Sequence, residues 1–232
     1  VRNHFVTSLS TAEVVAKNRE SLYRDFYDYR RSAIEEGSSG DIRAYVIPAQ
    51  TDQGMAARLA GLLKGHGIEI YRATRDFRAG GNSYDAGSYV INAAQPAKRL
   101  VRVLLDVQVP MDDAFIQEQE ARRDRNLPDQ IYDVTAWSLP LMFNVDMETS
   151  SRAVPINAGF EAVDHDGVIP ASIANADAKV AYLVPWGSVN AGRLLSRALR
   201  DGVRVKSSDK SFTHGDHMKN MTFCNLLVCC SI

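Results

Sequence analysis

The sequence has little cysteine, no excess of either charge and no long hydrophobic run. Its three cysteines, Cys224, Cys229 and Cys230, are crowded into the last nine residues, a spacing that suits neither a disulfide framework nor a zinc site. The formal net charge of −1 leaves no electrostatic footprint for nucleic acid or for an anionic membrane, so neither is expected as a partner. No apolar run approaches the roughly 20 residues that a membrane-spanning helix needs.

A signal peptide and an initiator methionine are also missing. The chain opens with Val1-Arg2-Asn3, which predicts a processed product or a fragment. The composition is that of an ordinary globular protein, with 45% apolar and 24% charged residues. At 232 residues the chain is long enough for one large domain or two small ones.

A repeated unit is the most informative feature that is present. Ala44-Tyr45-Val46-Ile47-Pro48 returns 137 positions later (181 − 44) as Ala181-Tyr182-Leu183-Val184-Pro185. Each copy is followed by an amphipathic stretch, a glycine and a second short branched run. The pattern predicts two strand-helix-strand units, over about residues 42–105 and 180–232.

Strands that alternate with helices predict the fold class. We expect an α/β domain over residues 42–232, with a mostly parallel sheet and helices on both faces, of the flavodoxin-like or amidotransferase-like kind. Residues 147–179 are polar and loop-like, but short strands are expected there because unstructured spans of that length are uncommon.

After Lys219 the repeat predicts a strand, a proline and a helix. Only a strand-like run is present, so an altered or truncated end is expected.

The first 37 residues read as one long helix. Ser10-Thr11-Ala12-Glu13 has the form of a capping box, and the helix is expected to continue to Glu36, before Gly37. Its apolar and aromatic face is wide and has no evident partner in the chain. The Ser10–Glu36 helix is therefore expected to pack against a domain that precedes Val1.

The sharpest metal motif is a His-x-x-Glu, His66 to Glu69, with His165 further along the chain. Zinc peptidases use two ligands in close sequence and a distant histidine. The repeat argues against a zinc site, because His66 aligns with Asp201 and Glu69 with Arg204. These positions then form an ordinary helix-to-strand turn, and no metal ligand is expected in this chain.

Other motifs for catalysis are weaker. His214-Gly215-Asp216-His217 aligns with the glycine turn at 79–82 and reads as a polar turn, and His4 stands alone. Ser188 lies between a strand and a helix but lacks the second glycine of a nucleophile elbow, and an N-cap role explains it. We expect no catalytic residue. In a parallel sheet, ligands bind beyond the carboxyl ends of the strands, and the loops there comprise Gln50, Thr51, Asp52, Trp186, Gly187 and Ser188.

Several stretches resemble the C-terminal portion of a secreted bacterial subgroup of zinc carboxypeptidases. They are Val1–Ser10, Asp25–Tyr27, Gln119–Leu127 and, most specifically, Tyr132–Pro140 with Val109-Pro110-Met111 upstream. The resemblance implies that a zinc peptidase domain precedes Val1, that the Ser10–Glu36 helix closes that domain, and that the rest is similar in fold to class I glutamine amidotransferases.

The resemblance carries no catalytic residue onto this chain. The family's zinc ligands, substrate-binding arginine and catalytic glutamate have no matching positions, and the amidotransferase cysteine elbow is missing. What is implied is a secreted or periplasmic accessory region of a peptide-hydrolysing zinc enzyme, with the parent peptidase domain as partner and a peptide substrate as a further one. The alternative is an independent α/β module that binds a small ligand through the two loops.

Overall fold

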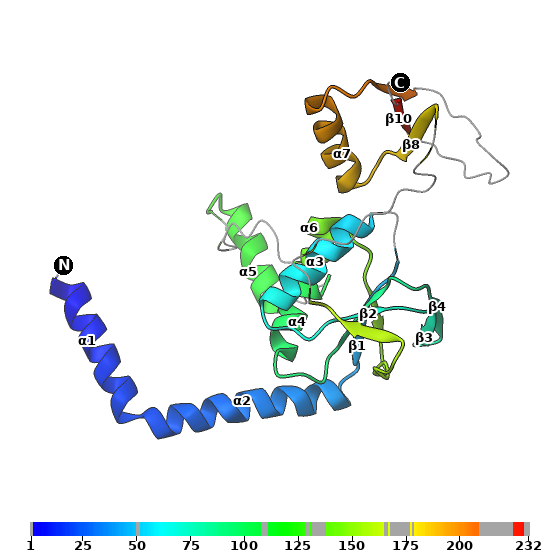
Figure 1. Ribbon diagram of the computed structural model, residues 1–232. Coiled ribbons are helices and arrows are strands. Elements are labelled where there is room, and N and C mark those ends of the chain that lie inside the picture. The colour runs from blue at the N-terminus through cyan, green and yellow to red at the C-terminus, as the bar shows by residue number, and fades with distance from the viewer. Residues whose placement is uncertain are drawn as a thin grey trace.

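The computed structural model describes residues 2–49, 52–107, 111–128, 130, 138–164, 167, 177, 179–208 and 225–229, and for residues 185, 208 and 225–229 it describes the backbone alone. A helical arm leads into a mixed α/β body, and a smaller strand-helix-strand unit follows it (Figure 1). The prediction of an α/β chain is thus confirmed in its general form.

The N-terminal region is two helices and not one. Helix α1 spans Arg2–Lys17 and helix α2 spans Arg19–Ser39. Asn18 separates them with φ −106° and ψ 14°, and its Nδ2 donates to the carbonyl oxygen of Val14 at 2.8 Å. A side chain that bonds to a carbonyl of the preceding turn commonly accompanies such a bend. The predicted capping box is wrong, because Ser10 lies inside α1.

The body is built around a five-stranded sheet. Its strands are β1 (Ala44–Ile47), β2 (Tyr71–Ala73), β5 (Tyr89–Asn92), β6 (Glu148–Ser150) and β7 (Phe160–Ala162). They lie in the order β6-β1-β5-β2-β7. Strands β6 and β7 are the short strands expected within residues 147–179.

Every pair of neighbouring strands in this sheet is antiparallel, so the predicted mostly parallel sheet is wrong. The cause is the position of β5. Helix α3 (Gln53–Gly65) connects β1 to β2, and these two strands run in the same direction because each is antiparallel to β5. The hairpin of β3 (Phe77–Ala79) and β4 (Asn82–Tyr84) comes next in the chain. Strand β5 follows this hairpin and lies between β1 and β2.

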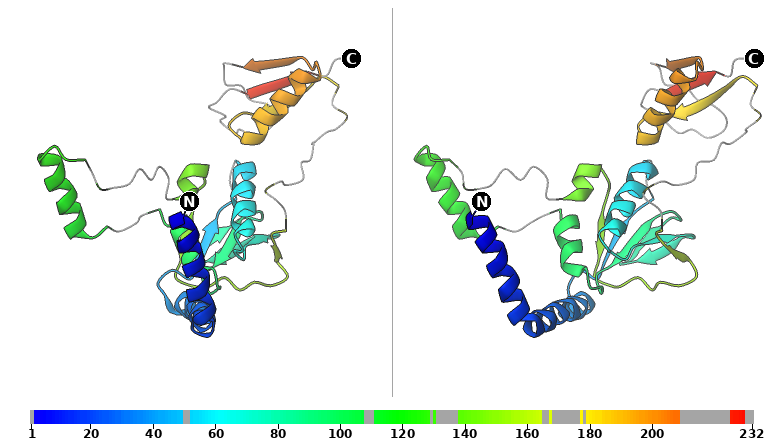
Figure 2. Two further views of the ribbon diagram at one scale, coloured as in Figure 1. Left: turned by 90° about the vertical axis from the view of Figure 1, so that its left-hand side faces the viewer. Right: turned by 60° about the vertical axis from the view of Figure 1, so that its left-hand side comes forward.

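The prediction of helices on both faces of the sheet is also wrong for the described residues. On one face, Tyr45 and Ile47 of β1 pack with α3, with α4 (Lys98–Leu105) and with α6 (Leu139–Phe143). On the opposite face, Ala44 and Val46 pack with the β3–β4 hairpin and with Val154. Helix α5 (Asp113–Asp124) is capped by Asp112, whose carboxylate accepts from the Ala114 N–H, and it extends away from the sheet (Figure 2).

A second sheet repeats the first in register. Strands β8 (Ala181–Pro185), β10 (Asn225–Cys229) and β9 (Val205–Ser208) lie in the order β8-β10-β9, and helix α7 (Val189–Arg200) connects β8 to β9. Ala44 pairs with Asn92, and the residues 137 positions later, Ala181 and Cys229, pair with each other. As in the body, the central strand is antiparallel to both neighbours.

We call residues 44–162 unit 1 and residues 181–208 with 225–229 unit 2. The strand that the repeat predicts near the end of the chain is β10. The helix-ending turns also match, since Gly67 and Gly202 adopt φ values of +75° and +72°. The duplicated strand-helix-strand unit therefore exists, although the strand that follows it lies between its two strands.

Candidate functional site

The two loops that the sequence places at strand ends meet in the structure. Gln50 and Thr51 lie outside the described residues, but Asp52 is the N-cap of α3 and its Oδ1 accepts from the Met55 N–H at 3.0 Å. Ser188 is the N-cap of α7, and its Oγ accepts from the Ala191 N–H at 3.2 Å. Both residues are short polar side chains of the kind that favours this position.

One hydrogen bond joins the two loops. The second carboxylate oxygen of Asp52, Oδ2, accepts from the backbone N–H of Val189 at 2.8 Å. Close packing accompanies it, because a Cβ added to Gly54 would lie 2.5 Å from Nδ2 of Asn190. The start of α3 and the start of α7 are thus in direct contact, and Asp52 stands between them.

The electrostatics of this meeting point follow from the helix ends. The N-terminus of a helix carries a partial positive charge, and its first four N–H groups have no partner within the helix. A carboxylate between two such ends stabilises both.

In the loop that precedes Ser188, Trp186 is partly exposed and Gly187 has a φ of +118°, which favours glycine. A ligand role for these loops stays a prediction.

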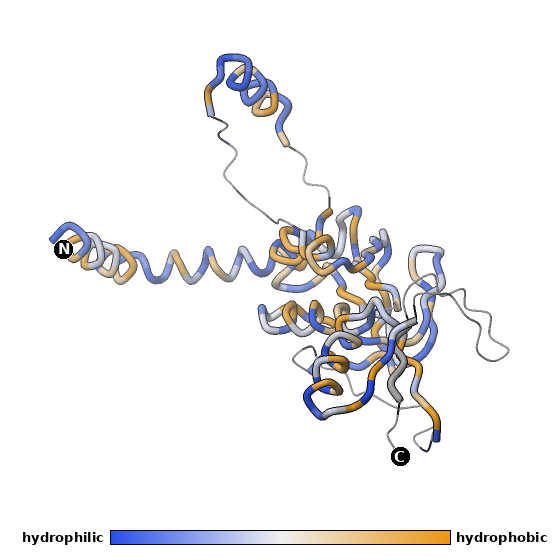
Figure 3. The backbone as a smooth tube through the Cα atoms, turned by 90° about the horizontal axis from the view of Figure 1, so that it is seen from above, coloured by the Kyte–Doolittle hydropathy of each residue, from blue (hydrophilic) through white to orange (hydrophobic). Residues whose placement is uncertain are grey.

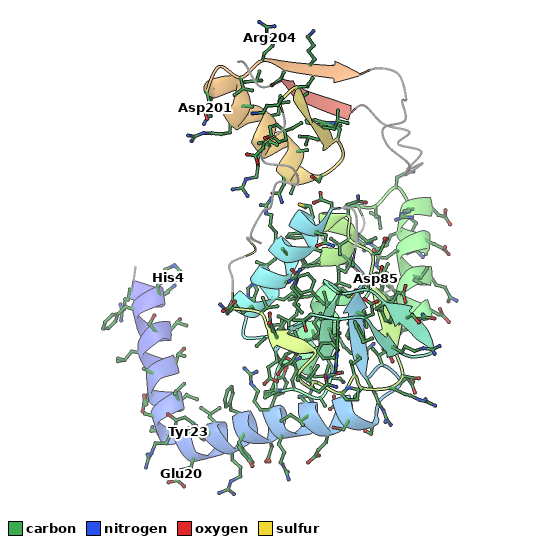
Figure 4. All side chains as sticks on the ribbon, turned by 45° about the vertical axis from the view of Figure 1, so that its right-hand side comes forward. His4, Glu20, Tyr23, Asp85, Asp201 and Arg204 are labelled. Carbon is green, nitrogen blue, oxygen red and sulfur yellow. The ribbon has the colours of Figure 1, made fainter. Side chains whose placement is uncertain are left out.

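The His66–Glu69 segment lies at the opposite end of α3. His66 is the C-cap of α3, and the corresponding residue Asp201 ends α7 with nearly the same dihedral angles. Asp201 and Arg204 stand at the end of unit 2 that is remote from unit 1, and His4 stands on α1 (Figure 4). The remaining candidates, His165, His214 and His217, fall outside the described residues.

Within the part of the chain that the structure describes, no cluster of three or more His, Cys, Asp or Glu side chains could hold a metal ion. No described helix is both long and apolar enough to cross a bilayer.

One polar group that the sequence did not reveal lies at the edge of the core. The Tyr45 hydroxyl donates to Asp106 Oδ1 at 2.6 Å, and Arg102 Nε donates to Asp106 Oδ2 at 3.0 Å. Burial, followed by the bond to Asp106, raises the pKa of Tyr45 far above its ordinary value. The bond to Asp106 also raises the pKa of Arg102. In the sequence, the i, i+4 spacing of Arg102 and Asp106 indicates that these two side chains can pair. No sequence signal indicates that Tyr45 joins them.

A second missed group fastens the arm to the body. Glu36 of α2 accepts from Lys98 Nζ at 2.8 Å and from Arg99. These two hydrogen bonds, Lys98 first, lower the pKa of Glu36. The Arg99 guanidinium also lies 4.3 Å from the centre of the Tyr29 ring and donates to the Tyr29 carbonyl oxygen at 2.7 Å. The C-terminal half of α2 is thus held on α4.

The rest of the arm is open. Helix α1 has no buried residue, and in α2 only Ala33 and Gly37 are buried. Both helices extend away from the sheet, and hydrophobic turns recur along them (Figures 2 and 3). We define the arm face as one stripe at helical spacing on each helix, made of Phe5, Leu9, Ala12 and Ala16 on α1 and Leu22, Phe26 and Tyr29 on α2, all exposed.

Comparison with protein-family models finds no match to this chain. Comparisons with curated proteins and with solved structures give no match either.

Proposed function

We propose that this chain is a non-catalytic accessory region of a larger zinc-carboxypeptidase-like protein, and that the arm face docks on the peptidase domain. The observation that carries the proposal is the open arm face. The stripe on α2 continues in register to Ala33 and Gly37, which are buried against the body. The exposed part is therefore the extension of a face that already packs on protein.

The length and exposure of α1 support a docking role. A 16-residue helix with no buried residue is of marginal stability in water, because helices gain most of their stability from the packing of an apolar face. Phe5 and Leu9 are 67% and 60% exposed. Contiguous exposed apolar surface of this kind marks interaction sites.

The composition of the arm favours a protein surface as partner. Tyr23, Tyr27 and Tyr29 combine a large apolar ring with a hydroxyl that needs a polar partner, a combination enriched at protein interfaces. Acidic and basic side chains are interspersed along α2. A helix that lies on a membrane instead carries a predominantly basic polar face.

The enzymatic part of the proposal rests on the sequence resemblance alone. This part of the proposal assigns peptide-bond hydrolysis, the zinc ion, any peptide substrate and a secreted or periplasmic location to the parent protein. The isolated chain should then hydrolyse no peptide above background when zinc is added. Zinc-dependent, chelator-sensitive hydrolysis by these residues would overturn the assignment and would restore His66 and Glu69 as candidates.

The docking role is tested with a matched pair of substitutions on α1. Leu9 belongs to the arm face, whereas Val14 is 57% exposed and lies on the other side of the helix. The partner is the zinc peptidase domain encoded upstream of Val1 in the source reading frame, expressed separately and titrated by calorimetry. Leu9→Ser should weaken binding by about 10- to 100-fold, because the interface loses the burial of one leucine side chain.

Val14→Ser should leave the affinity within about twofold, because Val14 stays in solvent. Equal losses from both substitutions, or no binding by the unaltered chain, would refute docking through the arm face. Circular dichroism of each variant controls for loss of helix.

The second candidate is a module that binds a small ligand without catalysis. The observation that favours it is the 2.8 Å hydrogen bond from the Val189 N–H to Asp52 Oδ2, which brings the Asp52 loop to the start of α7, directly after the Trp186–Ser188 loop. The source reading frame separates the two candidates. A His-x-x-Glu peptidase domain upstream of Val1 supports the accessory role, and a start codon at Val1 supports the independent module.

A further inference from the structure

We infer that Asp52 is a clamp that fixes unit 2 to unit 1, and that it positions the Trp186–Ser188 loop without being a ligand contact itself. Its two carboxylate oxygens serve two different helices, Oδ1 the Met55 N–H of α3 and Oδ2 the Val189 N–H of α7. The residues in the second bond are 137 positions apart in the chain. This inference does not depend on which proposed function is correct.

The Val189 N–H has a specific need for this carboxylate. Val189 is the first residue of α7, and the first four N–H groups of a helix have no acceptor within the helix. The helix's own cap, Ser188, accepts from Ala191 and leaves the Val189 N–H to Asp52. A hydrogen bond to an ionised acceptor is roughly twice as strong as a neutral one.

Charge makes the clamp necessary as well as favourable. The starts of α3 and α7 both carry partial positive charge, so their approach is unfavourable unless an anion lies between them. The Asp52 carboxylate is that anion, and both of its oxygens are engaged. An anionic ligand at the same point would be repelled by Asp52, which argues for a positioning role.

Glycines lie at two close contacts of α3. A Cβ at Gly54 would lie 2.5 Å from Asn190 Nδ2 and 3.1 Å from Val189 Cγ1. Gly167, between the units in sequence, lies so close to α3 that an added Cβ would be 2.6 Å from the Cα of Arg58. Its φ of +81° also favours glycine. The start of α7 and Gly167 thus both lie tightly against α3.

Amide hydrogen exchange on the full chain tests the clamp, read by NMR at single residues. Asp52→Ser keeps an N-cap oxygen for Met55 but has no second oxygen for Val189. We expect exchange at the Val189 N–H to rise about tenfold or more, whereas Met55 changes little. Ser188→Ala should do the opposite and raise exchange at Ala191 while sparing Val189.

A second pair of variants tests the contact without touching the carboxylate. Gly54→Ala makes α3 a better helix, but it displaces the end of the Asn190 side chain and crowds Val189 Cγ1, so exchange at Val189 should rise by less than in Asp52→Ser while that of the unit 1 core is unchanged. Gly192→Ala on α7 is the control, because an added Cβ there meets nothing within 4 Å.

Residual dipolar couplings give the relative placement of the units. The unaltered chain and Gly192→Ala should fit one alignment tensor for units 1 and 2, and Asp52→Ser should need two. Unchanged Val189 exchange in Asp52→Ser, or one shared tensor in that variant, would overturn the clamp. The Gly54→Ala result keeps the test valid even if Asp52→Ser weakens α3.

Discussion

Gly37 gives the sharpest test of how the arm is seated on the body. A glycine-to-alanine change inside an exposed helix usually stabilises it by about 0.5–1 kcal/mol. At Gly37 an added Cβ would lie 2.2 Å from the carbonyl oxygen of Ala93, 2.4 Å from its carbon and 2.7 Å from the Ala94 nitrogen. These are backbone atoms that cannot rotate aside, so α2 must move by roughly 1 Å to reach ordinary contact distance.

We therefore expect the sign of the effect to invert. Gly37→Ala should lower the free energy of unfolding by about 1–3 kcal/mol, the usual cost of overpacking, because moving α2 also strains the Glu36 bonds to Lys98 and Arg99. Urea unfolding followed by near-ultraviolet circular dichroism, which reports the buried tyrosines of unit 1, measures it. Gly192→Ala is the matched control and should stabilise the chain. If Gly37→Ala were as stable as the unaltered protein, α2 would not cross the backbone at Ala93.

Two further predictions concern ionisable groups. Because the pKa of Tyr45 is raised in the folded protein, its neutral hydroxyl stabilises the fold at every pH below 10.0, the ordinary pKa of tyrosine. This contribution to stability is lost as the pH rises above that value. Tyr45→Phe should cost about 1 kcal/mol at neutral pH and flatten part of the alkaline loss, measured by thermal unfolding against pH. An unchanged alkaline profile would contradict the buried Tyr45–Asp106 bond. The lowered pKa of Glu36 means that its contribution is present above the ordinary value of 4.5 and is lost as pH falls through the lower one. Glu36→Gln should remove that acid-side loss, and a variant that keeps it would show that Glu36 does not hold α2 on α4.

Local signals in the sequence predicted local structure well. The N-cap role of Ser188 is confirmed, and so is the helix-to-strand turn at His66, which is the C-cap of α3. Each of these features depends on a few adjacent residues, because a capping side chain bonds to an amide two or three positions away. The meeting of Asp52 with Val189 could not be read in this way, since it joins residues 137 positions apart.

The order of strands was not readable from the sequence for the same reason. Alternating strands and helices favour a parallel sheet when consecutive strands become neighbours. Here β1 and β2 are parallel to each other, but β5 lies between them and makes every pair antiparallel. The capping box at Ser10 failed because the chain is already helical from Arg2 onward, and the Glu13 carboxylate accepts from Lys17 instead of reaching back to Ser10.

The two copies of the repeat are not equally covered, and their difference indicates why the clamp matters. Val46 of β1 is fully buried, whereas its counterpart Leu183 in β8 is 39% exposed. In unit 1 the hairpin β3–β4 covers that face, and β6 pairs with the outer edge of β1. Among the described strands, β10 alone pairs with β8. Regions with little buried apolar surface open at lower free energy than the rest of a protein. Of the two units, unit 2 is therefore expected to open first, and the Asp52 bond to α7 opposes that opening from outside the unit.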